Sequence, residues 1–576
     1  MSNIPRPEYP RPQFVRDAWD NLNGVWQFEV DQGDTGEERG LLNKARLDEE
    51  IVVPFCPESK LSGIGSTDFM RAVWYRRAFH TQPEQRGKRV LLHFGAVDYD
   101  CTVWVNGVRV GGHLGGYTPF VFDITPALAD GENILTVRAR DDTRSPMQPT
   151  GKQSAEHFAS QGCFYTRTTG IWQTVWLEYV NPSYLSSVRF RPDAANDRLY
   201  VSAQAVQAAG CILRVETFFD GQPTGGDSVL VRGGIADACV RVTGRHYWNV
   251  SEPNLYSVQL TLEKDGQVLD RLDSYAGLRD VRFDGMRFLI NERPVFQRLV
   301  LDQGFYPDGI YTAPSDEALK NDIALSQAMG FNGARLHQKV FEPRFLYHAD
   351  HMGYLCWGEM ASWGLDVSHH EATEVFLRDW LTEIKRDFSA PSIIGWCPLN
   401  ETWDVQGRKQ MDDVPRTLYR VTKALDDTRP CIDTSGNYHV ETDIFDLHEY
   451  EQNPDVFASY YGKNAPLLYD RLAQRQTYEG QPTFLSEYGG IWWSDTDDTG
   501  WGYGQRPASR EEFLDRYRRL TDTLLDNPAH FGFCYTQLTD VEIEQNGLYT
   551  YDREPKFPVA VIRQINARPA ACEKEA

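Results

Sequence analysis

The chain lacks several features that would assign it to common protein classes. In its 576 residues no run approaches the ~20 apolar residues that a membrane-spanning helix needs. Its ten cysteines occur singly from Cys56 to Cys572, without the paired spacing of a zinc site or the density of a disulfide scaffold. The segment from Met1 to Phe14 has four prolines and no apolar core, so no secretory signal is expected. These absences predict a soluble, cytoplasmic protein.

Positive charge is also scarce. Lys and Arg number 59 against 82 Asp and Glu, which gives a formal net charge of −23. Because like charges repel at long range, nucleic acids and anionic membranes are not expected as partners, and a neutral substrate suits the chain better. The hydrophobic content of 41% and the aromatic content of 12% are those of a folded protein. The length predicts about two to four domains.

The first two regions are expected to be β-sandwiches. Short alternating apolar runs continue to about residue 182, and Asn106-Gly107 joins two of them. Both residues of an Asn-Gly pair tolerate positive φ, so this pair predicts a tight hairpin. Alternation continues over residues 183–279, a length that fits one immunoglobulin-like sandwich.

From about residue 280 to 576 the pattern becomes short apolar strands separated by helical stretches. A helix is predicted over 316–329, because this segment begins with an acidic first turn and Gly330 follows it. Eight strand-helix units over roughly 250 residues are the size of a TIM (β/α)8 barrel. The candidate strands are 295–301, 333–336, 354–357, 394–399, 431–434, 444–447, 483–486 and 531–535.

Two glutamates follow these strands at their C-terminal ends, where a barrel enzyme holds its reacting groups. Glu401 comes after the fourth candidate strand and Glu487 after the seventh. Cleavage of a glycosidic bond needs two carboxyl groups in different protonation states, one on each side of the anomeric carbon. We therefore expect Glu401 and Glu487 to be catalytic.

Other polar and aromatic side chains occur at the same strand ends. A sugar presents hydroxyl groups and C–H faces, so a pocket of carboxylates, amides and rings suits it. Some of these residues could instead only tie the barrel together or cap an insertion. The candidates for substrate binding are Asn400, Arg335, His337, Glu359, Asn437, His448, Tyr450, Trp492, Tyr535, Gln537 and Asp540.

No cofactor and no metal are expected. The pair His348 and His351, and the run His369-His370-Glu371, lack the second half of a recognised zinc motif, and solvated helix positions explain them better.

The whole chain resembles glycoside hydrolase family 2. The resemblance implies a sugar-binding jelly roll over 1–182, an immunoglobulin-like sandwich over 183–279 and a catalytic barrel over 280–576. The matching motifs are 22–26 (LNGVW), 73–77 (VWYRR), 103–107 (VWVNG), 169–173 (TGIWQ), 253–256 (PNLY), 330–337 (GFNGARLH), 350–353 (DHMG), 391–401 (PSIIGWCPLNE) and 486–489 (SEYG).

The resemblance also implies roles for individual residues. Glu401 would be the acid/base and Glu487 the nucleophile of a retaining mechanism, Asn400 would bind the sugar 2-hydroxyl, and Tyr450 would orient the nucleophile. Retention requires carboxyl groups about 5–5.5 Å apart, whereas about 9 Å would indicate inversion. The charge of Glu487 is expected to raise the pKa of Glu401.

Departures from the family pattern bear on the sugar. Members that act on glucuronides carry an Asn-x-Lys motif after the eighth strand, and here the matching positions are Glu544 and Asn546. Because a glutamate and an asparagine would repel or fail to bind a carboxylate, glucuronidase activity is disfavoured. The large galactosidases continue into further β-domains, whereas this chain ends soon after the barrel region.

The preferred interpretation is an exo-acting β-galactosidase-type enzyme for small neutral glycosides or oligosaccharides, working as a homo-oligomer. The alternatives are an arabinofuranosidase, a galactofuranosidase, a uronidase with a different carboxylate clamp, or an inactive carbohydrate-binding protein.

Overall fold

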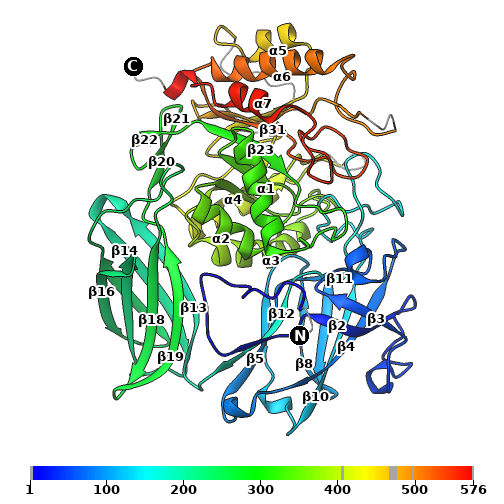
Figure 1. Ribbon diagram of the computed structural model, residues 1–576, viewed down its shortest axis with the longest axis vertical. Coiled ribbons are helices and arrows are strands. Elements are labelled where there is room, and N and C mark those ends of the chain that lie inside the picture. The colour runs from blue at the N-terminus through cyan, green and yellow to red at the C-terminus, as the bar shows by residue number, and fades with distance from the viewer. Residues whose placement is uncertain (1–3, 404–407, 466–475, 496–498, 574–576) are drawn as a thin grey trace.

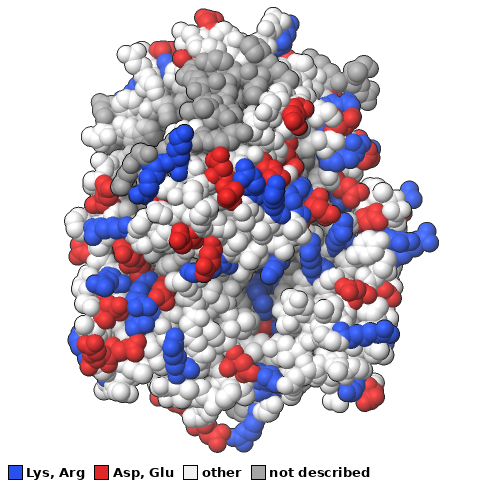
Figure 2. Space-filling model, turned by 180° about the vertical axis from the view of Figure 1, so that it is seen from behind, with Lys and Arg blue, Asp and Glu red and all other residues white. Residues whose placement is uncertain are grey.

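The computed structural model describes residues 4–403, 408–465, 476–495 and 499–573. Figure 1 shows a blue sandwich and a green sandwich side by side, with a layer of helices and parallel strands above both. Within the described ranges no helix has the length and apolar character needed to cross a bilayer. Figure 2 shows acidic and basic side chains interspersed over the opposite face, so the negative net charge forms no single acidic patch there.

The first region is a jelly-roll sandwich. Its two main sheets have the strand orders β1-β12-β5-β9 and β3-β2-β4-β10-β7-β8, and β6 pairs separately with β11. The apolar side chains of both sheets, including Trp26 and Tyr75, meet in one core. The strands are β1 (Trp19–Asn21), β2 (Gly24–Val30), β3 (Glu49–Val53), β4 (Ala72–His80), β5 (Arg89–Phe94), β6 (Val97–Asp98), β7 (Asp100–Val105), β8 (Val108–Leu114), β9 (Phe120–Asp123), β10 (Glu132–Arg140), β11 (Gly170–Ile171) and β12 (Val175–Val180).

The predicted Asn-Gly hairpin is confirmed. Strands β7 and β8 pair antiparallel with Val105 opposite Val108. Asn106 has φ 51° and Gly107 has φ 78°, so both turn residues occupy the left-handed region that this pair tolerates.

The second region is an immunoglobulin-like sandwich. A three-stranded sheet in the order β13-β14-β17 packs on a four-stranded sheet in the order β16-β15-β18-β19. The hairpin strands β20, β21 and β22 then lead into the barrel. The bounds are β13 (Tyr184–Asp193), β14 (Arg198–Val206), β15 (Ile212–Phe219), β16 (Gln222–Leu230), β17 (Ile235–Arg241), β18 (Tyr256–Lys264), β19 (Gln267–Ala276), β20 (Val281–Asp284), β21 (Arg287–Ile290) and β22 (Arg293–Pro294).

The third region is the TIM barrel. Seven parallel strands form one sheet in the order β26-β25-β24-β23-β31-β30-β29. The fifth predicted strand is reduced to a bridge between Trp396 and Cys431 and to the short pair β27-β28. The strands are β23 (Gln297–Asp302), β24 (Gly333–Leu336), β25 (Leu355–Glu359), β26 (Ile393–Cys397), β27 (Leu399–Asn400), β28 (Thr434–Ser435), β29 (Phe445–Glu449), β30 (Thr483–Gly489) and β31 (His530–Thr536).

Helices cover the outside of this sheet (Figure 1). The predicted first helix is confirmed, since the Ser315 side chain caps it by accepting from the Ala318 amide and the chain leaves it at Gly330. The helices are α1 (Asp316–Ala328), α2 (Pro343–Met352), α3 (Glu371–Asp387), α4 (Asp413–Leu425), α5 (Pro454–Tyr461), α6 (Arg510–Leu525) and α7 (Val559–Asn566).

The jelly roll docks directly on the barrel. The buried Asp379 carboxylate of α3 accepts a hydrogen bond of 2.5 Å from the Thr118 hydroxyl. On the other side of the contact, the amides of Thr150 and Gly151 donate to the Trp363 carbonyl at 2.8 and 3.0 Å. The loop around residue 150 is therefore fixed against the C-terminal face of the barrel.

Candidate active site

Glu401 and Glu487 both lie at the C-terminal end of the parallel strands. Glu401 follows β27, and its amide donates to the Ser435 carbonyl of β28 at 2.9 Å. It has φ 43°, a left-handed conformation that is uncommon for a residue with a side chain and that turns the chain sharply at this point. Glu487 is part of β30 and is buried. The two carboxylates come from strands on different parts of the barrel and point to the same region.

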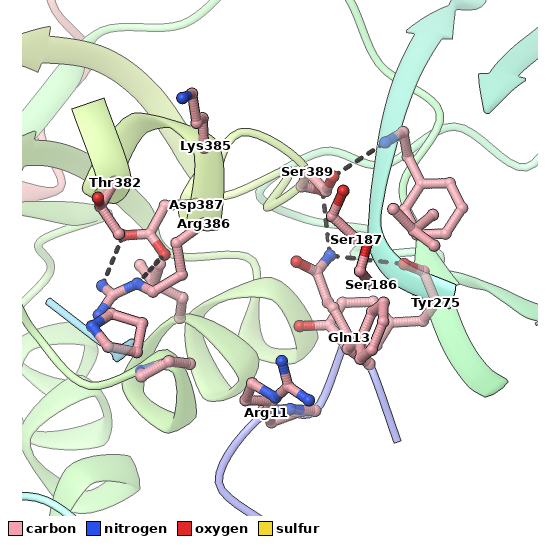
Figure 3. A pocket seen from close by; sticks show the side chains of 17 residues that line it. Arg11, Gln13, Ser186, Ser187, Tyr275, Thr382, Lys385, Arg386, Asp387 and Ser389 are labelled. Atoms are coloured by element: carbon pink, nitrogen blue, oxygen red, sulfur yellow. Dashed lines mark hydrogen bonds and ion pairs between the residues drawn. The ribbon is translucent and has the colours of Figure 1, made fainter. Parts of the chain in front are cut away.

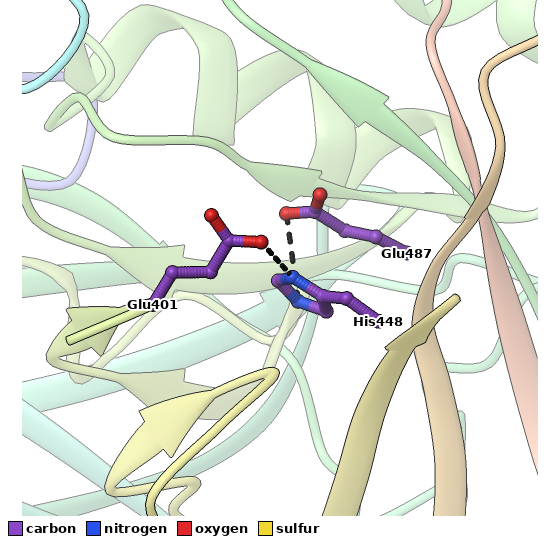
Figure 4. Close-up of side chains that lie close together, drawn as sticks. All are labelled: Glu401, His448 and Glu487. Atoms are coloured by element: carbon purple, nitrogen blue, oxygen red, sulfur yellow. Dashed lines mark hydrogen bonds and ion pairs between the residues drawn. The ribbon is translucent and has the colours of Figure 1, made fainter. Parts of the chain in front are cut away.

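The imidazole of His448 joins the two carboxylates (Figure 4). Its Nδ1 atom lies 2.6 Å from Oε1 of Glu401, and its Nε2 atom lies 3.5 Å from Oε1 of Glu487. Ligating atoms of the three residues all lie within 4.8 Å of one another. One oxygen of each carboxylate therefore lies within 4.8 Å of the other, closer than the roughly 9 Å typical of inverting glycosidases.

Arg335 organises the floor of the site. It contacts Glu359 through Nε, donates from Nη1 to Glu487 at 3.1 Å, and donates from Nη2 to Asn400 Oδ1 at 3.0 Å. The guanidinium is buried and always charged, so it stabilises the negative charge of Glu487. His337 lies behind it, with Nδ1 3.1 Å from Glu359 and Nε2 3.9 Å from Glu487.

His337 is neutral in this setting. Burial lowers the pKa of His337 well below its ordinary value, and the charges of Lys152 and Arg335 act in the same direction against the effect of Glu487. The imidazole can then act as a hydrogen-bonding group without adding charge.

Tyr450 holds the other oxygen of Glu487. Its hydroxyl donates to Glu487 Oε2 and lies 3.2 Å from the Thr536 hydroxyl. Burial, with the charge of Glu487, raises the pKa of Tyr450, so the hydroxyl stays protonated and remains a donor. The ring stacks on Tyr503 with centroids 3.5 Å apart, which fixes its orientation.

The expectation of a raised Glu401 pKa is wrong in this structure. Burial does raise the pKa of Glu401, but the hydrogen bond and charge of His448 and the charges of Lys152 and Arg335 outweigh it, so the pKa is lowered. His448 responds in the opposite sense. Burial lowers the pKa of His448, but Glu487 and Glu401 raise it by a larger amount, so the net shift of this pKa is upward. These opposite shifts favour a proton on the imidazole of His448 over one on the carboxyl group of Glu401.

Three further predicted binding residues, Asn437, Gln537 and Asp540, differ in the contacts that their side chains make. Asn437 is buried and, among the residues that the structure describes, both its amide atoms have no hydrogen-bond partner. Gln537 donates to Asn546 at 2.8 Å near the end of β31. Asp540 pairs with Lys556 at 2.6 Å and accepts from the Gly547 amide, so it holds its loop together.

Tyr535 and Trp492 are not brought to the carboxylates by any contact in the described ranges. Tyr535 packs against Tyr488 and against Tyr517 of α6, on the outer side of the strands. Trp492 lies beside Arg506 and Gly502, in a loop whose residues 496–498 lie outside the described ones. Strand position alone did not show which way these rings point.

Three residues near the site were missed: Lys152, Trp363 and Tyr503. Trp363 donates from Nε1 to the Asn400 carbonyl at 3.0 Å, and Lys152 lies over its ring. No local pattern marks these positions, because each lies in a loop and reaches the site only through the tertiary fold.

A cavity of about 690 Å³ opens beside Glu401. It brings aromatic rings of the jelly roll and barrel together, since Phe164 and Trp363 have centroids 5.4 Å apart. Its lining includes Cys163, Phe164, Trp363, Leu365, Asn400, Glu401, Trp403 and Arg408.

A second cavity, of about 300 Å³, is not the active site (Figure 3). It lies where the N-terminal segment, the immunoglobulin-like sandwich and α3 meet. Gln13 donates there to the Ser389 carbonyl at 3.1 Å, and Ser389 Oγ accepts from the Phe190 amide at 2.9 Å. These contacts tie the domains together and offer no pair of carboxylates.

The spacing of Glu401, His448 and Glu487 could also suit a metal ion. However, Glu487 Oε1 already accepts from Arg335, and a cation bound to that oxygen would lie next to the guanidinium. Repulsion between the two positive charges disfavours metal binding and favours the acid/base interpretation.

Comparison with known proteins agrees with this architecture. Models of the glycosyl hydrolases family 2 match the chain over residues 65–177 (sugar binding domain), 183–279 and 287–568 (TIM barrel domain). The three matches follow the sandwich, sandwich and barrel described above. The chain belongs to glycosyl hydrolases family 2.

Relatives in this family differ in the activity for which they are named. A beta-glucuronidase of Paenibacillus borealis is 23% identical over 603 residues, covering 96% of this chain and 98% of the relative. A beta-galactosidase of Thermoanaerobacter pseudethanolicus is 26% identical over 403 residues, covering 68% of this chain but only 51% of the relative, about half its length. The structure of Bifidobacterium dentium beta-glucuronidase complexed with coumarin-3-O-glucuronide superimposes with a TM-score of 0.80 at 20% identity, covering 97% and 98% of the chains.

Proposed function

We propose that the protein is a retaining, exo-acting glycoside hydrolase in which Glu487 is the nucleophile and Glu401 the acid/base. The observation that carries this proposal is that one oxygen of each carboxylate lies within 4.8 Å of the other, with His448 in contact with both. That spacing suits direct attack by one carboxylate, because an inverting enzyme needs room for a water molecule between the sugar and its base.

In the first step Glu487 attacks the anomeric carbon, the glycosidic C–O bond breaks, and Glu401 gives a proton to the departing oxygen. The proton comes from the pair that Glu401 forms with His448. Arg335 and Tyr450 bind the two oxygens of Glu487 and hold the carboxylate in position for attack. The product is a glycosyl ester on Glu487 and a free alcohol.

In the second step Glu401 accepts a proton from water, the water oxygen attacks the anomeric carbon, and the bond to Glu487 breaks. Loss of the Glu487 charge in the ester removes one of the effects that raise the pKa of His448. The pair can then deprotonate readily, which suits its role as a base in this step.

Two classes of sugar are candidates. A neutral β-galactoside is compatible with the sequence departures at Glu544 and Asn546, which disfavour a glucuronide, and one relative is named a beta-galactosidase. A β-uronide is the second candidate, because a relative that matches this chain over nearly its full length is named a beta-glucuronidase. Neither Glu544 nor Asn546 carries a positive charge that could bind a carboxylate, and Glu544 accepts hydrogen bonds from Tyr165 at 2.5 Å and from Asn546 at 2.9 Å.

Trapping tests the proposal directly. A panel of nitrophenyl glycosides would first identify the sugar, and its 2-fluoro derivative would then be incubated with the enzyme. We expect one stable covalent adduct, located on Glu487 by peptide mass spectrometry, and a product of retained configuration by NMR. An adduct on another residue, an inverted product, or no turnover of any glycoside would refute the proposal, the last in favour of an inactive carbohydrate-binding protein.

A further inference from the structure

Lys152 is a buried cation from the jelly roll in the candidate active site of the barrel. It exposes only 7% of its surface. Backbone hydrogen bonds fix the position of Lys152. The Tyr165 amide donates to the Lys152 carbonyl at 2.7 Å, and the amides of Thr150 and Gly151 donate to the Trp363 carbonyl. The placement of Lys152 therefore does not depend on a partner for its side chain.

Glycine allows this close approach. Gly151 has φ 59°, and a Cβ atom on it would lie 2.4 Å from the Gln338 carbonyl oxygen and 3.1 Å from Ala361. On the barrel side, a Cβ atom on Gly364 would lie 2.3 Å from the Thr150 hydroxyl. The loop can press against the barrel and deliver Lys152 only because both positions lack side chains.

The ammonium group of Lys152 lies over the face of Trp363, 3.9 Å from the ring centroid. Across the described ranges it forms no hydrogen bond and no ion pair. An ammonium has three N–H donors, and in a side chain that is largely buried the loss of hydration without replacement acceptors carries a cost. The cation–π contact with Trp363 offsets part of that cost but uses no acceptor.

The surrounding carboxylates are already engaged with other groups. Glu401 is bound to His448, Glu487 to Arg335 and Tyr450, and Glu544 to Tyr165 and Asn546. Their negative charges still act on Lys152. Burial lowers its pKa, but Cys163 and the three glutamates outweigh burial, so the pKa is raised and Lys152 stays protonated.

We propose that Lys152 is the specificity residue of this site and binds the carboxylate of a uronic-acid glycone. The proposal rests on the proposed function, since it names the sugar that Glu487 would attack. A carboxylate supplies acceptors for the unused donors, and hydrogen bonds between charged groups are the strong ones. The enzyme would then be a β-uronidase whose carboxylate-binding cation comes from the jelly roll instead of the barrel.

The kinetic test compares uronides with neutral sugars. Values of kcat/KM are measured for nitrophenyl β-D-glucuronide and β-D-galacturonide and for the matching glucoside and galactoside, in wild type, Lys152→Met and Lys152→Arg. We expect wild type to prefer a uronide. Lys152→Met should lower the uronide-to-hexoside ratio about 100-fold or more, and Lys152→Arg should lower it less. Lys385→Met removes an exposed lysine at the end of α3 and should leave the ratio unchanged.

A binding test separates this proposal from the mechanism. Calorimetry measures the affinity of free glucuronic and galacturonic acid for Glu487→Gln, with and without Lys152→Met, in samples whose melting temperatures show that they are folded. We expect Lys152→Met to weaken binding at least tenfold. An unchanged affinity, or a wild-type preference for neutral sugars with an unchanged ratio in Lys152→Met, would overturn the role of Lys152 even if Glu487 is the nucleophile. Full turnover by Glu487→Gln would instead refute the mechanism and leave the binding result standing.

Discussion

Nδ1 of His448 lies 2.6 Å from Oε1 of Glu401, which makes the histidine the nearest hydrogen-bonding partner of the proposed acid/base. The same imidazole lies 3.5 Å from Glu487. Its charge therefore responds to both carboxylates, and the proton needed for the first step belongs to a pair of residues instead of Glu401 alone.

Replacement of His448 by Gln should change the pH dependence. In wild type, activity falls on the alkaline side as the Glu401–His448 pair loses its proton, at a pKa above the ordinary histidine value because the net shift of His448 is upward. Without the imidazole, Glu401 holds the proton alone, and the ordinary pKa of a carboxyl lies about two units below that of an imidazole. The alkaline limb of kcat/KM should move to lower pH by about one unit or more.

The exposed His370 provides the control, since His370→Gln should leave the profile in place. An unchanged alkaline limb in His448→Gln would show that the histidine does not share the catalytic proton.

Replacement of Glu401 by Ala should separate the two chemical steps. Substrates with a poor leaving group should lose about 10²–10⁴-fold in kcat/KM, because general acid catalysis is removed. Substrates with an activated leaving group such as dinitrophenol need little protonation and should retain most of kcat/KM. Azide should accelerate their turnover and give a glycosyl azide of retained configuration, since the second step also lacks its base. An equal loss for both leaving groups, with no effect of azide, would assign the acid/base role elsewhere.

Replacement of Glu487 by Gln should lower kcat by about 10⁴-fold or more, since amides are poor nucleophiles. Glu479 precedes the same strand and is exposed, so Glu479→Gln is a matched control that should keep full activity. Steady-state kinetics on the preferred nitrophenyl glycoside measures both. A loss of less than tenfold in Glu487→Gln would contradict its assignment as the nucleophile.

Replacement of Gly151 by Ala should reduce both stability and specificity. The new Cβ atom would lie 2.4 Å from the Gln338 carbonyl, and the left-handed φ adds about 1–2 kcal/mol of strain. The melting temperature should fall, and the uronide-to-hexoside ratio should fall with it as Lys152 is displaced. Gly162 has φ 58° and no atom within 4 Å of its added Cβ, so Gly162→Ala carries the backbone strain alone. If the two variants behaved alike, the close approach of the loop would have no role in placing Lys152.

The local features of the fold could be predicted from the sequence because each depends on neighbouring residues. Asn106-Gly107 makes its turn, and Ser315 and Gly330 bound α1. Glu401 and Glu487 could be placed at strand ends because the carboxyl ends of parallel barrel strands share one face. Side-chain direction was less certain, and Tyr535 at a strand end packs outward against α6.

Amino-acid order by itself thus determined most of the barrel strands, the fifth excepted, and which two glutamates stand at strand ends. The tertiary structure decided the charge around them. His448 contacts both carboxylates. It lowers the pKa of Glu401, which the charge of Glu487 alone would raise. Lys152 belongs to the jelly roll, and its loop can contact the barrel because residue 151 is a glycine. Electrostatic interactions depend on distance in space, and a pattern of nearby residues carries no information about a charge delivered by a distant segment.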